Sequence, residues 1–323
     1  MCPFIRRFIV VGCMIVAGPA LGQAYPARPV RMIVPFSPGG TADIVARIAG
    51  QKLSELWEKQ VIVENRPGAD GNIGLEMVSK ASPDGYTLVM TNNGQFAMNP
   101  HLQAKLPYRP FEDFTPIAVV ADTPHVLVAY AAGPISSIGE LIAAAKARPG
   151  YITYSSPGSG SPGHVTAEWF ASEAGIKLLH VPYKGGGPAA AAVASGEVMT
   201  GMVGAPAALA FLKAGRVKVL GVTGTQRLAS APDWPTIAES GVPGINTRMW
   251  VGVFAPAGTP RAVIDKVSAD LTRAMRLPDV QQRLVAVGGE PVAASTPEET
   301  LARLKRDFAQ YQMVIQTSNI RVE

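Results

Sequence analysis

Short apolar runs alternate with stretches of helical periodicity along most of this chain. Apolar runs predict strands at 30–34, 61–64, 86–90, 117–120, 125–130, 151–155, 178–181, 198–203, 217–222 and 250–254. Apolar positions spaced three and four residues apart predict helices at 41–57, 72–81, 137–147, 164–174, 188–195, 206–214, 261–276 and 297–316. Strands that alternate with helices indicate an α/β fold with largely parallel sheets.

Two nearly unbroken apolar stretches, 123–130 and 250–256, differ from the other strand candidates. Unbroken apolar runs are typical of strands buried on both faces. About 120 residues of complete α/β sequence lie between the two stretches, which is close to the usual size of a domain. We therefore predict two α/β domains joined by two crossing strands, with a cleft and a hinge between them. The inserted domain would be 125–249, and the discontinuous one 25–124 plus 250–323.

The first strand ends in a stiff loop, 35–40, that contains two prolines and two glycines. Neither strand nor helix continues through such a loop, and helical periodicity starts at Thr41. The loop thus opens a helix N-terminus, where free N–H groups and the helix dipole favour an anion. Asp43, in the first turn of this helix, is either a ligand contact or an acid favoured by the dipole.

A similar junction lies in the predicted inserted domain. The loop 155–163 holds four serines, two prolines and three glycines, and helical sequence follows from His164. Two helix N-termini, one from each domain, would face each other across the cleft. Neither loop contains Arg or Lys, so N–H groups and hydroxyls would hold the ligand. A third junction of this kind, 183–188, is a further candidate border of the cleft.

Three other types of site match the sequence poorly. The glycines at 158, 160 and 163 have dinucleotide-loop spacing, but no acid follows around 178–184. Ser161 invites a hydrolase interpretation, yet it does not stand in a G-x-S-x-G elbow. The histidines at 101, 125, 164 and 180 lack paired metal-ligand spacing. We therefore expect no catalysis, no cofactor and no metal.

The N-terminus predicts export. Arg6 and Arg7 precede an apolar run at 8–17 and small residues up to Ala24, as in a signal peptide, residues 1–24, cleaved after Ala24 or alternatively after Gly22. A lipid-attachment pattern at 10–13 is a weaker alternative, because its Cys interrupts the apolar run. Without Arg6 and Arg7, 27 basic and 24 acidic residues leave +3. The basic residues are scattered, which disfavours nucleic-acid binding.

The chain resembles the Bug family, the extracytoplasmic solute receptors associated with tripartite tricarboxylate transporters. Five motifs carry the resemblance in order along the chain, at 33–40, 63–69, 82–88, 180–185 and 255–260. The resemblance implies a type II periplasmic-binding-protein fold with a Venus-flytrap cleft, whose two ligand-binding loops match 35–43 and 155–164. It also implies a periplasmic receptor that binds a small organic carboxylate. We expect this receptor to act as a monomer and to deliver the ligand to integral membrane transporter subunits, or alternatively to present it to a membrane signalling kinase.

The sequence departs from the family pattern at two positions. The family often places acidic residues where this chain has Met199 and Val203. If Val203 borders the cleft, the receptor lacks a carboxylate there that could pair with a ligand amine. We therefore predict a carboxylate ligand without an ammonium group, with an apolar part near Val203, Phe36 and Trp250. The full set of predicted ligand-binding residues is Phe36, Ser37, Gly39, Gly40, Thr41, Asp43, Asn93, Ser155, Ser156, Ser159, Gly160, Ser161, His164, Val203 and Trp250.

Overall fold

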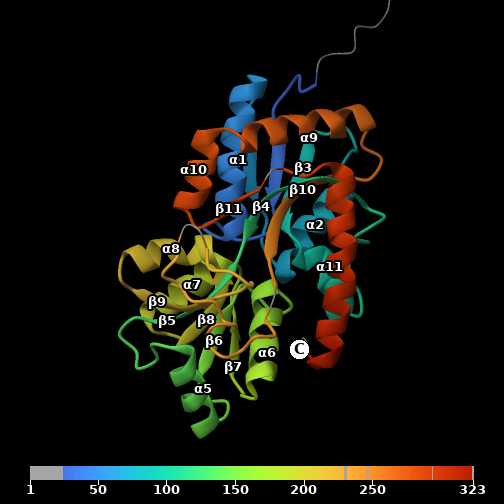
Figure 1. The fold of residues 1–323 in the computed structure, drawn as a ribbon. Helices are drawn as coiled ribbons and strands as arrows, with labels where there is room; N and C mark the ends of the chain where they lie inside the picture. Colours follow the sequence, from blue (N-terminus) through green and yellow to red (C-terminus); the bar gives the residue numbers. More distant parts are fainter. Residues whose placement is uncertain (1–24, 229–230, 246, 293, 322–323) are drawn as a thin grey trace, which may run out of the picture.

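The protein consists of two α/β domains, each built on one mixed sheet (Figure 1). The structure is a computed structural model, and it describes residues 25–321 except 229–230, 246 and 293. The signal peptide predicted at 1–24 lies outside the described residues. Among the helices of the described part, none combines the length and the apolarity needed to cross a membrane.

The first domain has a six-stranded sheet in the order β11-β4-β10-β3-β1-β2. Its strands are β1 (Val30–Val34), β2 (Val61–Asn65), β3 (Thr87–Asn92), β4 (Phe114–Thr123), β10 (Met249–Pro256) and β11 (Glu290–Pro291). Helices α1 (Thr41–Trp57), α9 (Arg261–Met275) and α10 (Pro278–Ala286) pack on one face. The other face carries α2 (Asn72–Ser79), α3 (Gly94–Ala97) and α11 (Pro297–Thr317). The short helix α4 (Asn99–Leu102) and a 3₁₀ turn, Ala69–Gly71, complete this domain.

The second domain has a five-stranded sheet in the order β7-β6-β8-β5-β9. Its strands are β5 (His125–Tyr130), β6 (Thr153–Ser156), β7 (Leu179–Pro182), β8 (Thr200–Gly204) and β9 (Val217–Val222). One face packs against α5 (Ile138–Ala147) and α6 (Pro162–Ala174), and the other against α7 (Gly186–Ser195) and α8 (Ala205–Lys213). Helix α11 of the first domain runs alongside α6 (Figure 1).

The strands next to the domain crossings run antiparallel to their neighbours. β10 is antiparallel to β3 and β4, and β5 is antiparallel to β8 and β9, whereas β1–β2, β1–β3, β6–β7 and β6–β8 are parallel. Parallel neighbours need a crossover connection. β4 leaves the first domain and β10 returns to it, so these two strands run in opposite directions. The domain limits at 124/125 and 249/250 stay a prediction.

Candidate ligand-binding site

A small cavity of ≈ 30 Å³ lies between the domains and is bordered by four helix N-termini. One of these helices, α1, belongs to the first domain, and the other three, α6, α7 and α8, belong to the second. The walls of the cavity include the first residues of α1, α6 and α7 and the residue that precedes α8. The lining residues are Phe36, Gly40, Thr41, Ala42, Asn92, His125, Pro157, Ser161, Pro162, Gly163, Gly186, Gly204 and Met249. We call this space the small cavity.

Three of these helices begin at a glycine that cannot cap them with a side chain. Gly40 precedes α1, Gly185 precedes α7 and Gly204 precedes α8, and none of the three helices has a side-chain cap. The first N–H groups of a helix have no acceptor within the helix. Among the four helices that border the small cavity, α6 alone has a side-chain cap, in which Ser161 Oγ accepts from the N–H of His164 at 3.3 Å. The first N–H groups of α1 and α7 are therefore the candidate donors to the small cavity, whereas the first N–H of α8, that of Ala205, already donates to Pro124 O at 3.0 Å.

The size and the field of the small cavity favour an anionic group. A single water needs roughly 10–15 Å³ of such volume, so ≈ 30 Å³ admits one group about the size of a carboxylate. Each helix contributes a partial positive charge at its N-terminus. No Arg or Lys is among the lining residues of the small cavity in the part of the chain that the structure describes. The small cavity can therefore bind a carboxylate through main-chain N–H groups.

The loop 35–40 of the first domain touches the second domain. Ser37 Oγ donates a hydrogen bond to the main-chain oxygen of Lys184. A Cβ atom on Gly187 would lie 2.9 Å from Pro38 O, and one on Gly204 would overlap Thr41 Oγ1. The glycines thus allow the two backbones to approach closely. The structure therefore represents a closed arrangement of the domains.

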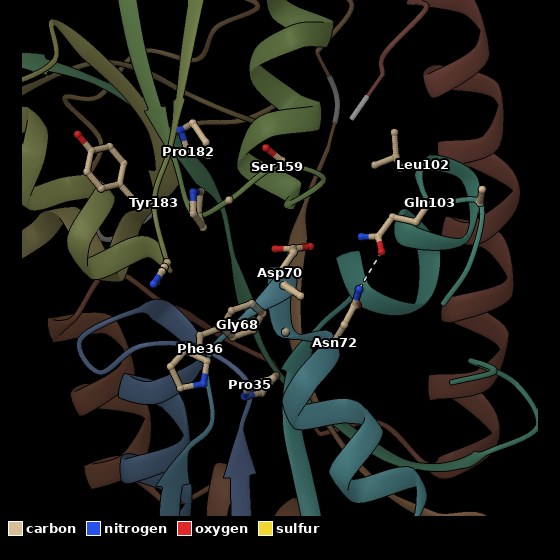
Figure 2. Close-up of a pocket in the computed structure, with 17 residues that line it drawn as sticks. Pro35, Phe36, Gly68, Asp70, Asn72, Leu102, Gln103, Ser159, Pro182 and Tyr183 are labelled. Atoms are coloured by element: carbon tan, nitrogen blue, oxygen red, sulfur yellow. Dashed lines mark hydrogen bonds between the residues drawn. The ribbon is translucent and has the colours of Figure 1, made fainter. Parts of the chain in front are cut away.

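A larger cavity of ≈ 650 Å³ adjoins the small cavity and shares Phe36 and Pro157 with it. Figure 2 shows its lining, in which Asn72 donates to Gln103 Oε1 at 2.8 Å. The first domain contributes Pro35, Phe36, 67–72 and 102–104, and the second contributes 157–159 and 182–184. We call this space the large cavity. Ser159 is the predicted serine that lines it.

Asp43 supports the first loop from inside the first domain. Its Oδ2 accepts from the N–H of Gly39 at 2.9 Å, and its Oδ1 accepts from Asn65 Nδ2 at 2.9 Å. Arg47 forms an ion pair with the same carboxylate at 2.9 Å. Gly39 has φ +78°, which favours glycine. Both oxygens of Asp43 are thus engaged within the protein, so this residue holds the loop in shape.

Two histidines stabilise the second loop. Gly160 donates its N–H to His164 Nδ1 at 3.1 Å, and the ring of His164 stacks on that of His180 with centroids 4.1 Å apart. His180 Nε2 lies 2.7 Å from Ser156 Oγ. Burial lowers the pKa of His164 to about 3 and that of His180 to about 4. Both rings are therefore neutral and structural at neutral pH.

Ten of the fifteen predicted residues lie outside the linings of both cavities, and four of these ten are held by contacts deep in the two domains. Trp250 Nε1 donates to Asp307 Oδ2 at 2.6 Å, and Asn93 Nδ2 donates to the same oxygen at 2.9 Å. Ser155 Oγ donates to Ala189 O at 2.9 Å, and Val203 is fully buried in the apolar core under α7 and α8. An apolar contact between the ligand and Val203 or Trp250 is therefore not supported.

Of the predicted set, the small cavity brings together Phe36, Gly40, Thr41 and Ser161. Sequence reasoning missed His125, which lines the small cavity and whose two ring nitrogens are buried without a hydrogen-bond partner. Burial lowers the pKa of His125 to about 4. Sequence reasoning also missed Gly204, although a glycine between an apolar strand and a helix that starts with Ala205-Pro206 indicates a helix N-terminus without a side-chain cap.

The comparisons with known proteins agree with this geometry. The family model described as "Tripartite tricarboxylate transporter family receptor" matches residues 45–320. The chain is 33% identical to Protein BugT of Bordetella pertussis over 323 residues, which covers 98% of this chain and 99% of the relative. The R. palustris protein Rpa4515, solved with adipate, superimposes with a TM-score of 0.89 at 33% identity and covers 92% of this chain and 99% of its own. MatC of Rhodopseudomonas palustris, solved with bound malate, has a TM-score of 0.84 at 30% identity and covers 90% of this chain and 100% of its own.

Proposed function

Since the chain belongs to the tripartite tricarboxylate transporter receptor family, we propose that it captures one small organic carboxylate between its domains and delivers it to membrane transporter subunits. The family consists of periplasmic solute receptors, and the fold is that of periplasmic binding proteins. Under this proposal the protein acts in the periplasm as a monomer, and it performs no chemical step on its ligand.

The observation that supports the proposal most directly is the convergence of α1, α6, α7 and α8 on the small cavity. Helices α1 and α7 lack a side-chain cap, so a bound carboxylate would supply an acceptor for their first N–H groups, and α8 adds the positive end of its dipole. The related structures with adipate and malate support the same ligand class.

The proposed anchor is strong enough without a basic residue. A hydrogen bond to a charged group contributes about 1.5–3 kcal/mol, whereas micromolar affinity needs about 8 kcal/mol. A few N–H groups together with the Thr41 hydroxyl therefore suffice. The ligand favours domain closure because it contacts both domains only in the closed state.

The test is calorimetric titration of ligand-free protein with carboxylates and with their uncharged primary amides. We expect carboxylates to bind and their amides to bind at least about tenfold more weakly, because an amide lacks the charge that the helix termini favour. Thr41→Val should weaken carboxylate binding by about 1–2 kcal/mol without changing thermal stability in the ligand-free state.

A matched control is Thr87→Val, in β3 away from both cavities. The proposal fails if no member of a broad carboxylate panel releases heat or raises the melting temperature. Equal binding of acids and amides would also contradict it, because the anion anchor would then contribute nothing.

A further inference from the structure

Asp70 places an acidic side chain in the large cavity, in a position with unusual strain and burial. It lies in the 3₁₀ turn Ala69–Gly71 with φ +49°, in the left-handed region that non-glycine residues seldom adopt. The residue as a whole is partly exposed to the cavity, whereas its Oδ1 is buried without a hydrogen-bond partner. Figure 2 shows the carboxyl group at the centre of the lining.

The unpartnered oxygen faces the other domain. Asp70 Oδ1 lies 3.5 Å from the position that a Cβ atom would take on Gly158, in the second loop. Asn99 Oδ1, a second buried acceptor without a partner, lies 3.5 Å from the corresponding position on Gly160. Both oxygens therefore lie against the same stretch of the second domain. Burial raises the pKa of the Asp70 carboxyl group, and the Asn99 side chain is close enough to Asp70 to lower that pKa in part.

The surrounding amides fix the carboxyl group in place. Gln95 Nε2 donates to the main-chain oxygen of Asp70 at 3.1 Å and to its Oδ2 at 3.4 Å. Asn72 accepts from Asn99 Nδ2 and from the Tyr108 hydroxyl, each at 3.3 Å, and donates to Gln103. This network holds the side of Asp70 that faces the first domain, and the buried Oδ1 lies against the second loop at the border of the large cavity.

We propose that the large cavity binds the far end of the ligand and that this end carries an ammonium group, which donates a hydrogen bond to the Asp70 carboxylate. The inference rests on the proposed function, because the carboxylate end is assigned to the small cavity. It departs from the expectation of a ligand without an amine, which depended on Val203. Val203 lies in the core, and Asp70 supplies the acid from another element.

The arrangement of the two cavities sets the spacing of the ligand groups. Their linings share only Phe36 and Pro157, so a ligand that reaches both must pass these two side chains. In an α-amino acid the ammonium group is bonded to the carbon next to the carboxylate, so both groups would stay on the same side of Phe36 and Pro157. The geometry therefore selects an ω-amino carboxylate, whose methylene chain would pack against the Phe36 ring and the Pro157 ring.

The experiment compares ω-amino carboxylates with dicarboxylates of matched length by calorimetry, for example 5-aminopentanoate with adipate. We expect the wild-type protein to bind the amine at least about tenfold more tightly, since hydrogen bonds to charged groups contribute about 1.5–3 kcal/mol. Asp70→Asn keeps the shape and tolerates the left-handed backbone, and it should remove the preference. Asp84→Asn, at an exposed ion pair with Arg28, is the matched control.

Proton exchange gives a second readout. Burial raises the pKa of Asp70 to about 8 in this closed structure, whereas an open cavity returns it toward about 4. When the domains close over adipate at pH 6.5, the Asp70 carboxylate then takes up a proton. When they close over an ω-amino carboxylate, it stays ionised and takes up none. Titrations in buffers of different ionisation enthalpy should show that the two ligands differ by about one proton in the wild type and by none in Asp70→Asn. The variant keeps the other titratable groups of the cavity and network, Tyr183, Lys184 and Tyr108.

Three results overturn the inference. Unchanged amine affinity in Asp70→Asn, tighter wild-type binding of adipate than of the amine, or equal proton exchange with both ligands would each do so. If dicarboxylates bind and no ω-amino acid in the panel from three to six carbons does, the inference fails and the proposed function stands. If neither class binds, the proposed function fails too.

Discussion

Three histidines near the domain interface are held neutral by burial. His125 borders the small cavity, and His164 and His180 stack beneath the second loop. Their pKa values fall from about 6.5 to about 4, 3 and 4 respectively. A group with a lowered folded-state pKa stabilises the fold fully above its unfolded pKa, and that stability is lost as the pH falls below about 6.5.

We therefore predict that the free energy of unfolding decreases between pH 7 and pH 5. Each fully buried histidine would contribute about 2 kcal/mol to the loss at pH 5, because the unfolded chain binds a proton that the folded chain does not. Urea unfolding at the two pH values measures the change. His180→Gln should reduce the pH dependence relative to the wild type, and a stability that is the same at both pH values would contradict the prediction.

At the level of single residues, local sequence predicted some of the site and missed the rest. Thr41 and Ser161 follow Pro/Gly-rich loops and begin helical sequence, so their place near a helix N-terminus was visible. Asp70 stands in a strong turn sequence, and the residue that lies against its Oδ1, Gly158, is far along the chain. The surroundings of His125 also come from distant residues, such as Thr223, whose Oγ1 accepts from its N–H at 3.0 Å. Local patterns carry no trace of such contacts.

At the level of elements, α11 is fastened to the first sheet by one carboxylate. Asp307 Oδ2 accepts from Trp250 Nε1 of β10 and from Asn93 Nδ2 next to α3. Burial raises the pKa of Asp307, so its removal would leave two donors in a poorly hydrated place. Trp250 and Asn93 thus connect three elements through one oxygen.

We predict that Asp307→Ala lowers the free energy of unfolding by about 3 kcal/mol, since each buried unpaired donor costs about 1–3 kcal/mol. Asp307→Asn keeps an acceptor oxygen and should lose clearly less. Urea unfolding at pH 7 provides the measurement. If the alanine and asparagine variants were equally stable, the two hydrogen bonds would not be what holds α11.

Apolar patterning predicted most elements, and its failures have local causes. α10 was not predicted because its buried side chains are Val280 and Leu284, too few to show a period. The helix predicted at 188–195 begins at Gly186 in the structure. Its first turn was not predicted because it contains two glycines, which have low helical propensity. Those glycines are the ones that meet the loop 35–40. The sequence signal was weakest where the domains touch.

At the level of the whole molecule, closure depends on small residues at the seam. Gly204 has φ −65°, so alanine fits its backbone, but the added methyl group would overlap Thr41 Oγ1 of the other domain. Gly204→Ala should therefore leave each domain folded and keep the domains apart.

We predict that this variant binds carboxylate at least about tenfold more weakly and that its radius of gyration in small-angle scattering does not decrease on ligand addition, in contrast to the wild type. Gly139→Ala, in α5 with open space around it, is the control. Wild-type affinity and compaction in Gly204→Ala would show that the seam tolerates the methyl group.

The glycine caps of α1, α7 and α8 also bear on how this receptor can diverge. An anchor made of main-chain N–H groups has no side chain of its own to lose, so substitutions that leave the backbone and the close approach of the domains intact keep its charge preference. The side chains that line the large cavity, Asp70 and Gln103 among them, carry no such constraint. Under the proposed function, substitutions in the large cavity would therefore change which acid is bound, while the hold on its acid group stays as long as the glycines of the seam are kept.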